Sequence, residues 1–329
     1  MEKLTLKNIR HGIQIGLAVF LLYLGWRFYQ FVLFFSGGQG GSPVPRPPAV
    51  ESFLPISALM SFRVWLTTGV FDKVHPAGLA IFLAILATAL LLRKGFCGWL
   101  CPVGSLSEAL GLLGKRWGIQ VRMPKVLDIL LKSLKYLVLG FFAKVIFIDM
   151  PVVAVQYFLV NDYNKVADVK MLNFFLNLSS IAVIVLLVLA GLSVVFRHFW
   201  CRYLCPYGAL MGILGLLSPV AVKREESHCI DCKKCDKVCP SDLRVSQMNR
   251  VYSPECVGCM NCVDACPKKE ALTIKAGPRV ISGRYYAVAL MAVFFGIIFW
   301  AKVSGHWHTS ISLQEFAKLI PMSDYLNHF

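Results

Sequence analysis

Long apolar segments alternate with basic, polar ones along most of this chain. Apolar runs cover about residues 13–35, 77–92, 134–154, 172–196 and 285–301. Each run is close to the ~20 residues that a helix needs to cross the hydrocarbon core of a bilayer. The pattern therefore predicts an α-helical integral membrane protein with about five transmembrane helices.

The composition agrees with this prediction. Of the 329 residues, 57% are hydrophobic and only 16% are charged, whereas an ordinary soluble domain is nearer half apolar and a quarter charged. The first apolar run follows a short basic stretch, and no small-residue cleavage site follows it. We therefore expect an uncleaved signal anchor at the N-terminus.

The distribution of basic residues predicts the orientation. If the N-terminus is cytoplasmic, 25 of the 34 Lys and Arg residues face the cytoplasm and seven face outward. Cytoplasmic loops normally carry this excess. We therefore expect a multi-pass protein of a bacterial-type cytoplasmic (inner) membrane, in contact with its lipid, with the C-terminus outside. The net charge of +16 follows from this topology, and no nucleic-acid partner is expected.

Two short helices are expected outside the spans. Pro55 suits the first turn of a helix, and the apolar residues from Ile56 to Trp65 continue it on the membrane surface. The tail after the last span resembles an interfacial aromatic residue followed by a short amphipathic helix.

A cysteine pattern, C-x-x-C-x-x-C-x-x-x-C-P, occurs twice between residues 228 and 267. The cysteines are Cys229, Cys232, Cys235 and Cys239 in the first copy, and Cys256, Cys259, Cys262 and Cys266 in the second. Soft thiolates at this spacing suit iron–sulfur clusters. Disulfides belong to small secreted domains, and zinc sites rarely repeat three cysteines in register before a Cys-Pro. The predicted topology places all twelve cysteines of the chain in the cytoplasm, where thiols stay reduced.

This segment resembles a bacterial-type ferredoxin domain with two [4Fe–4S] clusters. The resemblance implies a small α+β domain in which each motif supplies three ligands to one cluster and its last cysteine to the other. The implied ligands are Cys229, Cys232, Cys235 and Cys266 for one cluster, and Cys256, Cys259, Cys262 and Cys239 for the other.

A second repeat lies at the ends of two apolar runs, which read GFCGWLCPVGSL and FWCRYLCPYGAL. Cys97 and Cys101 correspond to Cys201 and Cys205, 104 residues later. Two such halves are expected to pack about a pseudo-twofold axis and to bring the four thiols to one depth. The four cysteines then form a metal or iron–sulfur centre, act as redox-active dithiols, or are buried structural thiols.

The complete cysteine framework is similar to that of the NapH/NosR/CcoG group of polyferredoxin membrane proteins. That resemblance implies the membrane component of a quinol dehydrogenase-type oxidoreductase, which exchanges electrons between the quinone pool and other redox subunits or a soluble carrier. The alternative that it implies is a CcoG-like assembly factor that reduces a metal ion such as copper. The direction of electron flow stays open, and no catalytic residue is predicted.

Haem is not expected as a cofactor. A b-type haem needs histidine ligands at depth within spans, whereas every histidine here lies at a span end or in a loop, and no C-x-x-C-H motif is present. The histidines are His11, His75, His198, His228, His306, His308 and His328. The ionisable residues of the outer half are candidates for a quinol site, although charged groups at this depth more often anchor the topology. They are Arg27, Lys144, Asp149, Glu51, Asp72 and His75. A quinol site nearer the C-x-x-x-C-P pairs is the alternative, because an outer site lies most of a ~30 Å hydrocarbon core from cytoplasmic clusters.

The predicted domain organisation has three parts. Residues 1–222 form a four-helix membrane region with the two C-x-x-x-C-P motifs, residues 223–280 form the inserted ferredoxin domain, and residues 281–329 form the fifth span and an outer tail.

Overall fold

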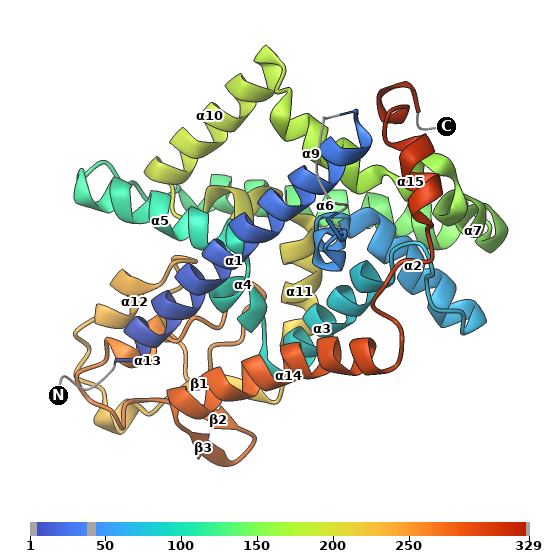
Figure 1. The fold of residues 1–329 in the computed structure, drawn as a ribbon. Coiled ribbons are helices and arrows are strands. Elements are labelled where there is room, and N and C mark those ends of the chain that lie inside the picture. Colours follow the sequence, from blue (N-terminus) through green and yellow to red (C-terminus); the bar gives the residue numbers. More distant parts are fainter. Residues whose placement is uncertain (1–4, 38–43, 327–329) are drawn as a thin grey trace. The chain divides into compact units, whose positions relative to one another are not determined.

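The computed structural model describes residues 5–37 and 44–326, and the chain forms two compact units. The first unit comprises residues 1–18, 85–140 and 183–294. The second comprises residues 19–84, 141–182 and 295–329. Helices dominate both units (Figure 1). All twelve cysteines belong to the first unit.

The first unit contains five helices and three strands of its own. They are α4 (Gly95–Trp99), α5 (Pro102–Arg116), α11 (Pro206–Leu216), β1 (Val220–Arg224), α12 (Lys234–Val238), α13 (Asn261–Asp264), β2 (Leu272–Ala276) and β3 (Arg279–Ile281), with a π-helix at Trp200–Leu204 and 3-10 turns at Glu226–His228 and Val245–Gln247.

The second unit contains short helices. They are α2 (Pro55–Thr68), α7 (Val152–Val160), α8 (Asp162–Lys165), α9 (Ala167–Leu176) and α15 (Leu313–Leu319), with 3-10 turns at Pro48–Phe53 and Ser323–Tyr325 and a π-helix at Val145–Asp149. Five further helices contribute residues to both units. They are α1 (Leu6–Phe35), α3 (Pro76–Leu92), α6 (Lys125–Lys144), α10 (Ser180–Val195) and α14 (Gly283–Val303).

Within the described ranges, two helices, α1 and α14, are long and apolar enough to cross a membrane. Two bent pairs raise this number to four if each is one span: α6 with its π-helical end and α7, bent by 107°, and α9 with α10, bent by 82°. Helix α3, at 17 residues, is apolar but shorter. The molecule is therefore mostly helical with two to four candidate spans, and the five-span arrangement stays a prediction.

The first bend has an identifiable cause. Pro151 has no backbone N–H and its ring disfavours helix in the residue before it, so the helix ends at the π-helical turn preceding Met150. Arg63 donates to the carbonyl groups of Ile146 and Met150, which the break leaves without helical partners.

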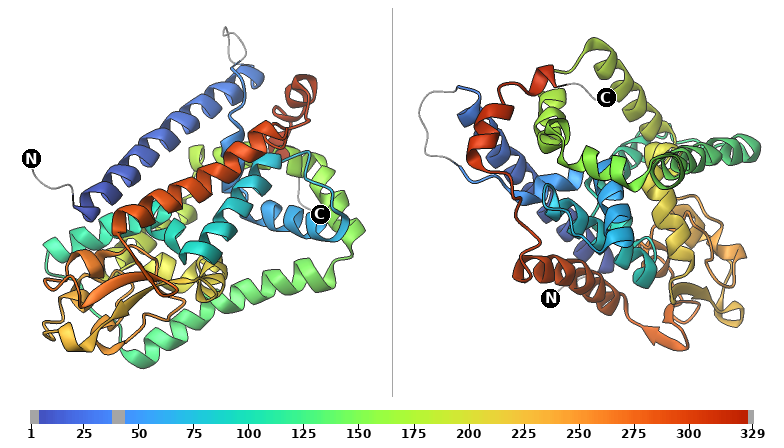
Figure 2. Two further views of the ribbon diagram at one scale, coloured as in Figure 1. Left: turned by 90° about the horizontal axis from the view of Figure 1, so that it is seen from below. Right: turned by 90° about the vertical axis from the view of Figure 1, so that its right-hand side faces the viewer.

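The first unit contains a three-stranded antiparallel sheet in the order β1-β2-β3. Val222 pairs with Ile274, which in turn pairs with Ile281. Val222, Leu272 and Ile274 are buried. Figure 2 shows the sheet beside the short helices α12 and α13, which carry cysteines of the two motifs.

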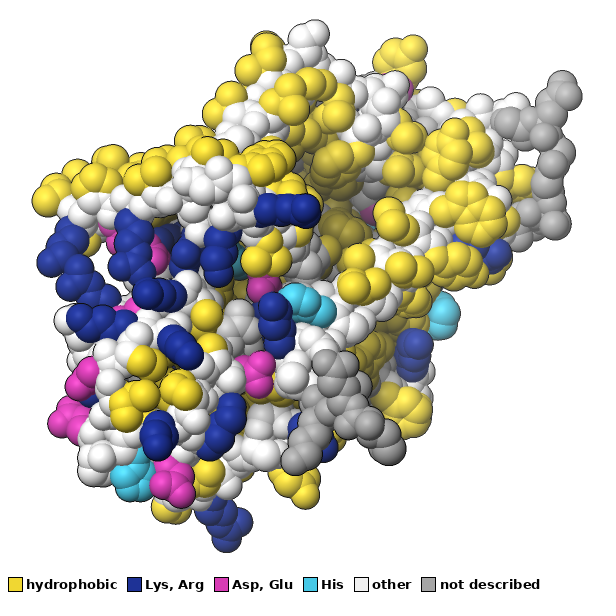
Figure 3. Space-filling view, turned by 90° about the vertical axis from the view of Figure 1, so that its left-hand side faces the viewer, with side chains coloured by type: hydrophobic (Ala, Val, Ile, Leu, Met, Phe, Trp, Pro, Cys, Tyr) yellow, Lys and Arg dark blue, Asp and Glu magenta, His cyan; other side chains and the backbone are white. Residues whose placement is uncertain are grey.

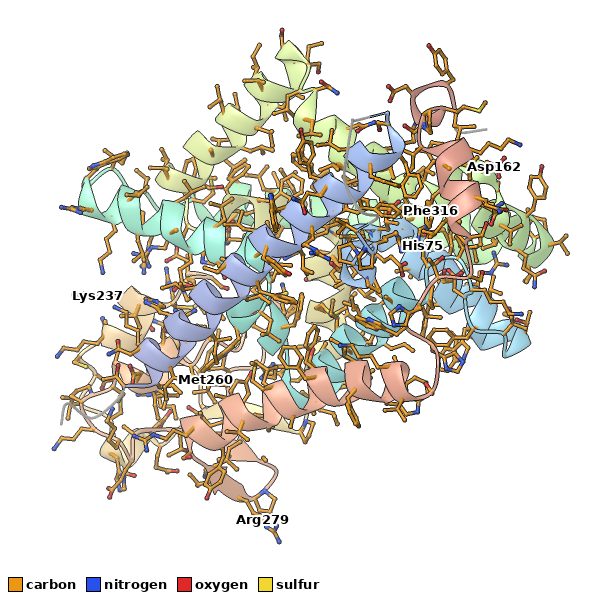
Figure 4. The ribbon with its side chains drawn as sticks, in the orientation of Figure 1. His75, Asp162, Lys237, Met260, Arg279 and Phe316 are labelled. Carbon is orange, nitrogen blue, oxygen red and sulfur yellow. The ribbon has the colours of Figure 1, made fainter. Side chains whose placement is uncertain are left out.

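The second unit has an aromatic core to which the C-terminal helix contributes. The rings of Phe31 and Phe316 meet edge to face at 5.3 Å between centroids, and Phe316 is labelled in Figure 4. Helix α15 begins with a capping box in which Ser312 and Glu315 satisfy each other's backbone N–H groups.

Candidate iron–sulfur sites

Two small cavities in the first unit are each lined by four cysteines. One is lined by Cys229, Cys232, Cys235 and Cys266. The other is lined by Cys239, Cys256, Cys259 and Cys262. Each cavity therefore takes three cysteines from one motif and the last cysteine of the other, as the ferredoxin resemblance implies.

The two motifs fold alike around their cavities. Lys233 and Met260 follow the second cysteine of each motif, and both take the left-handed conformation, with φ of 54° and 60°. This reversal starts α12 and α13, which present Cys235 and Cys262. Such backbone is uncommon for residues with a side chain. Its recurrence at matching positions indicates that the loop shape serves the cysteines.

The two cavities differ in exposure. Cys232 is exposed, whereas Cys239 and Cys259 are buried. Burial raises the pKa of Cys259 to about 12 and that of Cys239 to about 11. A buried thiol keeps its proton unless a cation offsets the cost of burying the thiolate. Iron supplies that cation, so a soft-metal cluster fits these donors.

Among the residues that the structure describes, no three Cys, His, Asp or Glu side chains are grouped to hold a single metal ion. A cubane makes a different demand, because each of its four thiolates binds a different iron atom and the sulfurs lie around the whole cluster. The four-cysteine cavities match that wider arrangement.

The C-x-x-x-C-P cysteines occupy equivalent places in the two halves of the repeat. Cys101 and Cys205 are the N-cap residues of α5 and α11, and each is followed by proline at the first helical position. The Cys205 sulfur accepts a hydrogen bond from Gly208 N at 3.2 Å. A helix N-terminus offers free backbone N–H groups to an anionic ligand, so both positions suit a metal-bound sulfur.

The structure brings these four cysteines into one neighbourhood. Burial raises the pKa of Cys97 to about 12 and that of Cys201 to about 11, and the Cys205 thiol adds to both shifts. Burial also raises the pKa of Cys101, with contributions from Cys97 and Cys201. The positive charge of Lys94 partly opposes the rise in the pKa of Cys97. The sequence repeat therefore produces a spatial cluster of thiols with a lysine beside it.

The ferredoxin segment packs directly on the first half of the repeat. A Cβ atom on Gly98 would lie 2.5 Å from the Val257 carbonyl oxygen and 3.3 Å from Cys259 Cα, so the contact requires glycine. Trp99 Nε1 donates to Gly258 O at 2.9 Å. The loop that carries Cys259 thus lies against the turn that carries Cys97.

In the second half of the repeat, Arg202 and Tyr203 correspond to Gly98 and Trp99, and both contact a carboxylate. Arg202 forms an ion pair with Asp128 at 2.8 Å, and Tyr203 donates to the same carboxylate at 2.6 Å. The two halves of the repeat therefore differ at the positions where the first half contacts the ferredoxin loop. Sequence reasoning missed this docking, although the Gly98–Arg202 mismatch inside an otherwise matched repeat was its signal.

A buried ion pair also joins helix α6 to the ferredoxin segment. Lys135 is fully buried, and its Nζ lies 2.7 and 2.6 Å from the two carboxylate oxygens of Glu255. Glu255 immediately precedes Cys256. No periodicity in the sequence indicated this pair.

Breaking this pair should destabilise the first unit strongly. Lys135→Met leaves the Glu255 carboxylate buried without its cation, and the free energy of unfolding should fall by about 3–5 kcal/mol. The double variant Lys135→Met/Glu255→Gln should recover most of the loss. Denaturation in detergent, followed by helical circular dichroism, measures both, and a single variant as stable as the parent contradicts the assignment.

In the second unit, Glu51 and His75 belong to a buried ion-pair network. Arg46 lies 2.7 Å from both Glu51 and Asp168, and His75 Nε2 lies 2.6 Å from Asn164 O. Burial opposes the charged form of Glu51, but Arg46 and His75 hold its pKa below the usual value. Because these side chains satisfy one another, they support a structural role more than a quinol site.

Comparisons with known proteins agree with the cysteine geometry. A family described as "4Fe-4S binding domain" matches residues 74–120 and 179–225, and each match contains one C-x-x-x-C-P motif. A family described as "4Fe-4S dicluster domain" matches residues 221–267. No solved structure is similar enough to match.

Three relatives illustrate the similarity. YccM of Escherichia coli (strain K12), named as an electron transport protein, is 38% identical over 97% of this chain and 91% of its own length. The ferredoxin-type protein NapH of the same organism is 26% identical over 58% of this chain and 66% of its own. The methylamine utilization ferredoxin-type protein MauN of Methylorubrum extorquens is 28% identical over 67% and 72%.

These findings define the class as an iron–sulfur electron-transfer protein whose helices are suited to a membrane. Within that class, the chain belongs to the NapH/NosR-type polyferredoxin family.

Proposed function

We propose that this protein transfers electrons between the quinone pool and a redox partner, as the membrane component of a quinol-linked respiratory or reductive chain. Two [4Fe–4S] clusters carry the electrons. Cys229, Cys232, Cys235 and Cys266 hold one cluster. Cys256, Cys259, Cys262 and Cys239 hold the other.

The observation that carries this proposal is the order of the cysteine sites within the first unit. The Cys97 turn packs on the Cys259 loop through Gly98. Cys239 and Cys259 in one cavity are buried, whereas Cys232 in the other is exposed. This order supports a path from the C-x-x-x-C-P thiols through the buried cluster to the exposed one, where a partner docks.

The four C-x-x-x-C-P cysteines would form a third centre at the start of this path. The two helix N-termini and Lys94 favour negative charge there, and iron would offset the repulsion between neighbouring thiolates. The match of each half to a 4Fe–4S binding family supports iron at this site. An iron–sulfur centre held by the four thiolates would supply one-electron chemistry, and the protein's contribution would be to bury and orient those ligands.

We further propose five spans, formed by α1, α3, α6 with α7, α9 with α10, and α14. The five apolar runs of the sequence fall on these helices, of which α1, α3, α6, α10 and α14 contribute residues to both units. The ferredoxin domain, residues 223–280, would follow the membrane region 1–222 and precede the segment 281–329. With the N-terminus and this domain in the cytoplasm, the basic residues follow the positive-inside rule.

The number of electrons that one quinol releases matches the number that two clusters would accept. Oxidation of one quinol breaks two O–H bonds and releases two protons and two electrons, and it leaves a quinone. Two [4Fe–4S] clusters, held by the eight cysteines of the two motifs, would accept one electron each, so one quinol would supply both. The protons pass to water, and a quinone can take the same electrons in reverse.

Electron paramagnetic resonance tests the proposal directly. Menaquinol or ubiquinol added anaerobically to the protein should produce the signal of reduced clusters, or the matching quinone should abolish the signal of dithionite-reduced protein. The dimethyl ether of the quinol, which cannot release protons, should have no effect. Failure of electron exchange in both directions, together with rapid reduction of Cu(II), would contradict the proposal and favour a metal-reducing assembly factor.

A further inference from the structure

The first unit contains a larger cavity that the cysteine sites do not account for. Its volume is about 340 Å³, within the size range of small-molecule pockets. The first turns of α1, helix α5 and the short helices α12 and α13 form its walls. Cys239, which also lines the buried cysteine cavity, is on its surface. A molecule bound here would therefore lie next to the buried cluster.

A buried histidine faces this cavity without a protein partner. His198 is only 8% exposed, and its Nε2 has no hydrogen-bond partner among the residues that the structure describes. Burial lowers its pKa to about 4, so the imidazole is neutral at physiological pH. A buried polar atom left unpaired costs about 1–3 kcal/mol. A ligand with a hydrogen-bonding oxygen would remove that cost.

The rest of the lining combines apolar side chains with charged ones of both signs, including the carboxylates of Glu108 and Asp264. Leu112 and Val238 supply apolar surface, and Lys115 and Lys237 supply positive charge. Lys237 is labelled in Figure 4. In Figure 3, Lys and Arg side chains gather beside a row of apolar side chains. Leu106, Leu112 and Leu113 of α5 are exposed, as expected for a helix at a membrane surface.

We infer that this cavity binds the ring of a quinone, with His198 Nε2 hydrogen-bonded to one ring oxygen. The inference rests on the proposed quinol-linked function and assigns its site. A quinone ring needs apolar walls for its faces and hydrogen-bonding groups for its oxygens, and this cavity provides both. The lysines stabilise the negative charge that develops on a ring oxygen as its proton leaves. The adjacent Cys239 gives the electrons a short route to the buried cluster.

Fluorescence quenching of 2-heptyl-4-hydroxyquinoline N-oxide, a quinone analogue, tests the site in the purified full-length protein. We expect one binding site per chain. His198→Leu removes the hydrogen bond and should weaken binding at least about tenfold, the equivalent of ~1.4 kcal/mol. Gly111→Leu tests the cavity independently. Gly111 lies in α5, and a Cβ there meets only Gln120 Nε2, at 3.7 Å. It should block the ligand, and the nearest group that it meets is the Gln120 amide, which donates to Gly111 O at 3.0 Å.

His308→Gln is the matched control, because His308 is exposed and belongs to the second unit. It should bind the analogue like the parent. Cluster absorbance and thermal unfolding show whether each variant is folded. Unchanged analogue binding in folded His198→Leu and Gly111→Leu overturns the inference, and the proposed function stands if quinol still reduces the parent. A parent that neither binds the analogue nor reacts with quinol overturns both.

The basic rim of the cavity also suits the phosphate group of an anionic lipid. Native mass spectrometry in phosphatidylglycerol distinguishes this occupant. If His198→Leu and Gly111→Leu remove a bound lipid but leave analogue binding unchanged, the cavity is a lipid site and the quinone assignment is wrong.

Discussion

Replacing Cys239 by alanine should remove the cluster of the second motif, although Cys239 belongs to the first. Cys239 lines one cavity with Cys256, Cys259 and Cys262. Without the Cys239 thiolate, one iron atom of the cluster would have no protein ligand, and the cluster should be lost. Chemical analysis of anaerobically purified protein should show about four fewer iron atoms per chain.

Pairs of substitutions make this test decisive. Cys232 and Cys266 line the same cavity, so Cys232→Ala/Cys266→Ala should lose no more iron than either single variant. Cys232→Ala/Cys239→Ala affects both cavities and should lose about eight iron atoms. If each motif held its own cluster without exchange, the two double variants would give the opposite results.

The sequence was most informative where a local chemical rule decides the structure. Pro55 predicted a helix start, and α2 begins at that residue. The tail was expected to contain a short helix, and α15 is capped by Ser312 and Glu315. In both cases the information lies within a few residues of the feature. The resemblance to ferredoxins, and not a local rule, implied which cysteines line each cavity.

Apolar length was a weaker guide to the spans. The run at 134–154 predicted one helix, but α6 begins at Lys125 and the chain bends at Pro151. The run at 172–196 is interrupted between α9 and α10, where Ser179 caps the second helix by accepting from Ala182 N. Hydropathy measures how apolar a segment is, whereas helix breaks depend on single prolines and caps.

The contacts that build the site were beyond local rules. Lys135 and Glu255 are 120 residues apart, and Arg46 and Asp168 are 122 apart. A charged residue in a sequence does not indicate its partner, and its burial depends on the tertiary fold. The cavity at His198 likewise combines five separate stretches of chain. Pairings of this kind require a structure.

The second large expected effect is the loss of a metal centre at the four C-x-x-x-C-P cysteines. The protein purified anaerobically should contain metal beyond the roughly eight iron atoms of two cubanes. Cys97→Ala and Cys205→Ala come from different halves of the repeat. Each should remove that excess and leave the two cubanes in place. Equal effects are expected because the thiols act as one set, as their mutual electrostatic influence indicates.

The control is Ser107→Ala, which removes a hydroxyl group 3.6 Å from the Cys201 sulfur without removing a thiol. It should retain the excess metal. A parent protein with only two cubanes, and with iron content unchanged by Cys97→Ala, would exclude a metal centre at these cysteines. The thiols would then be redox-active dithiols or structural groups. A mild oxidant would convert each dithiol to a disulfide, so a thiol titration afterwards would count two fewer thiols per pair, whereas structural groups would keep theirs. The start of the electron path depends on this result, because without a third centre the quinol must reduce the buried cluster directly.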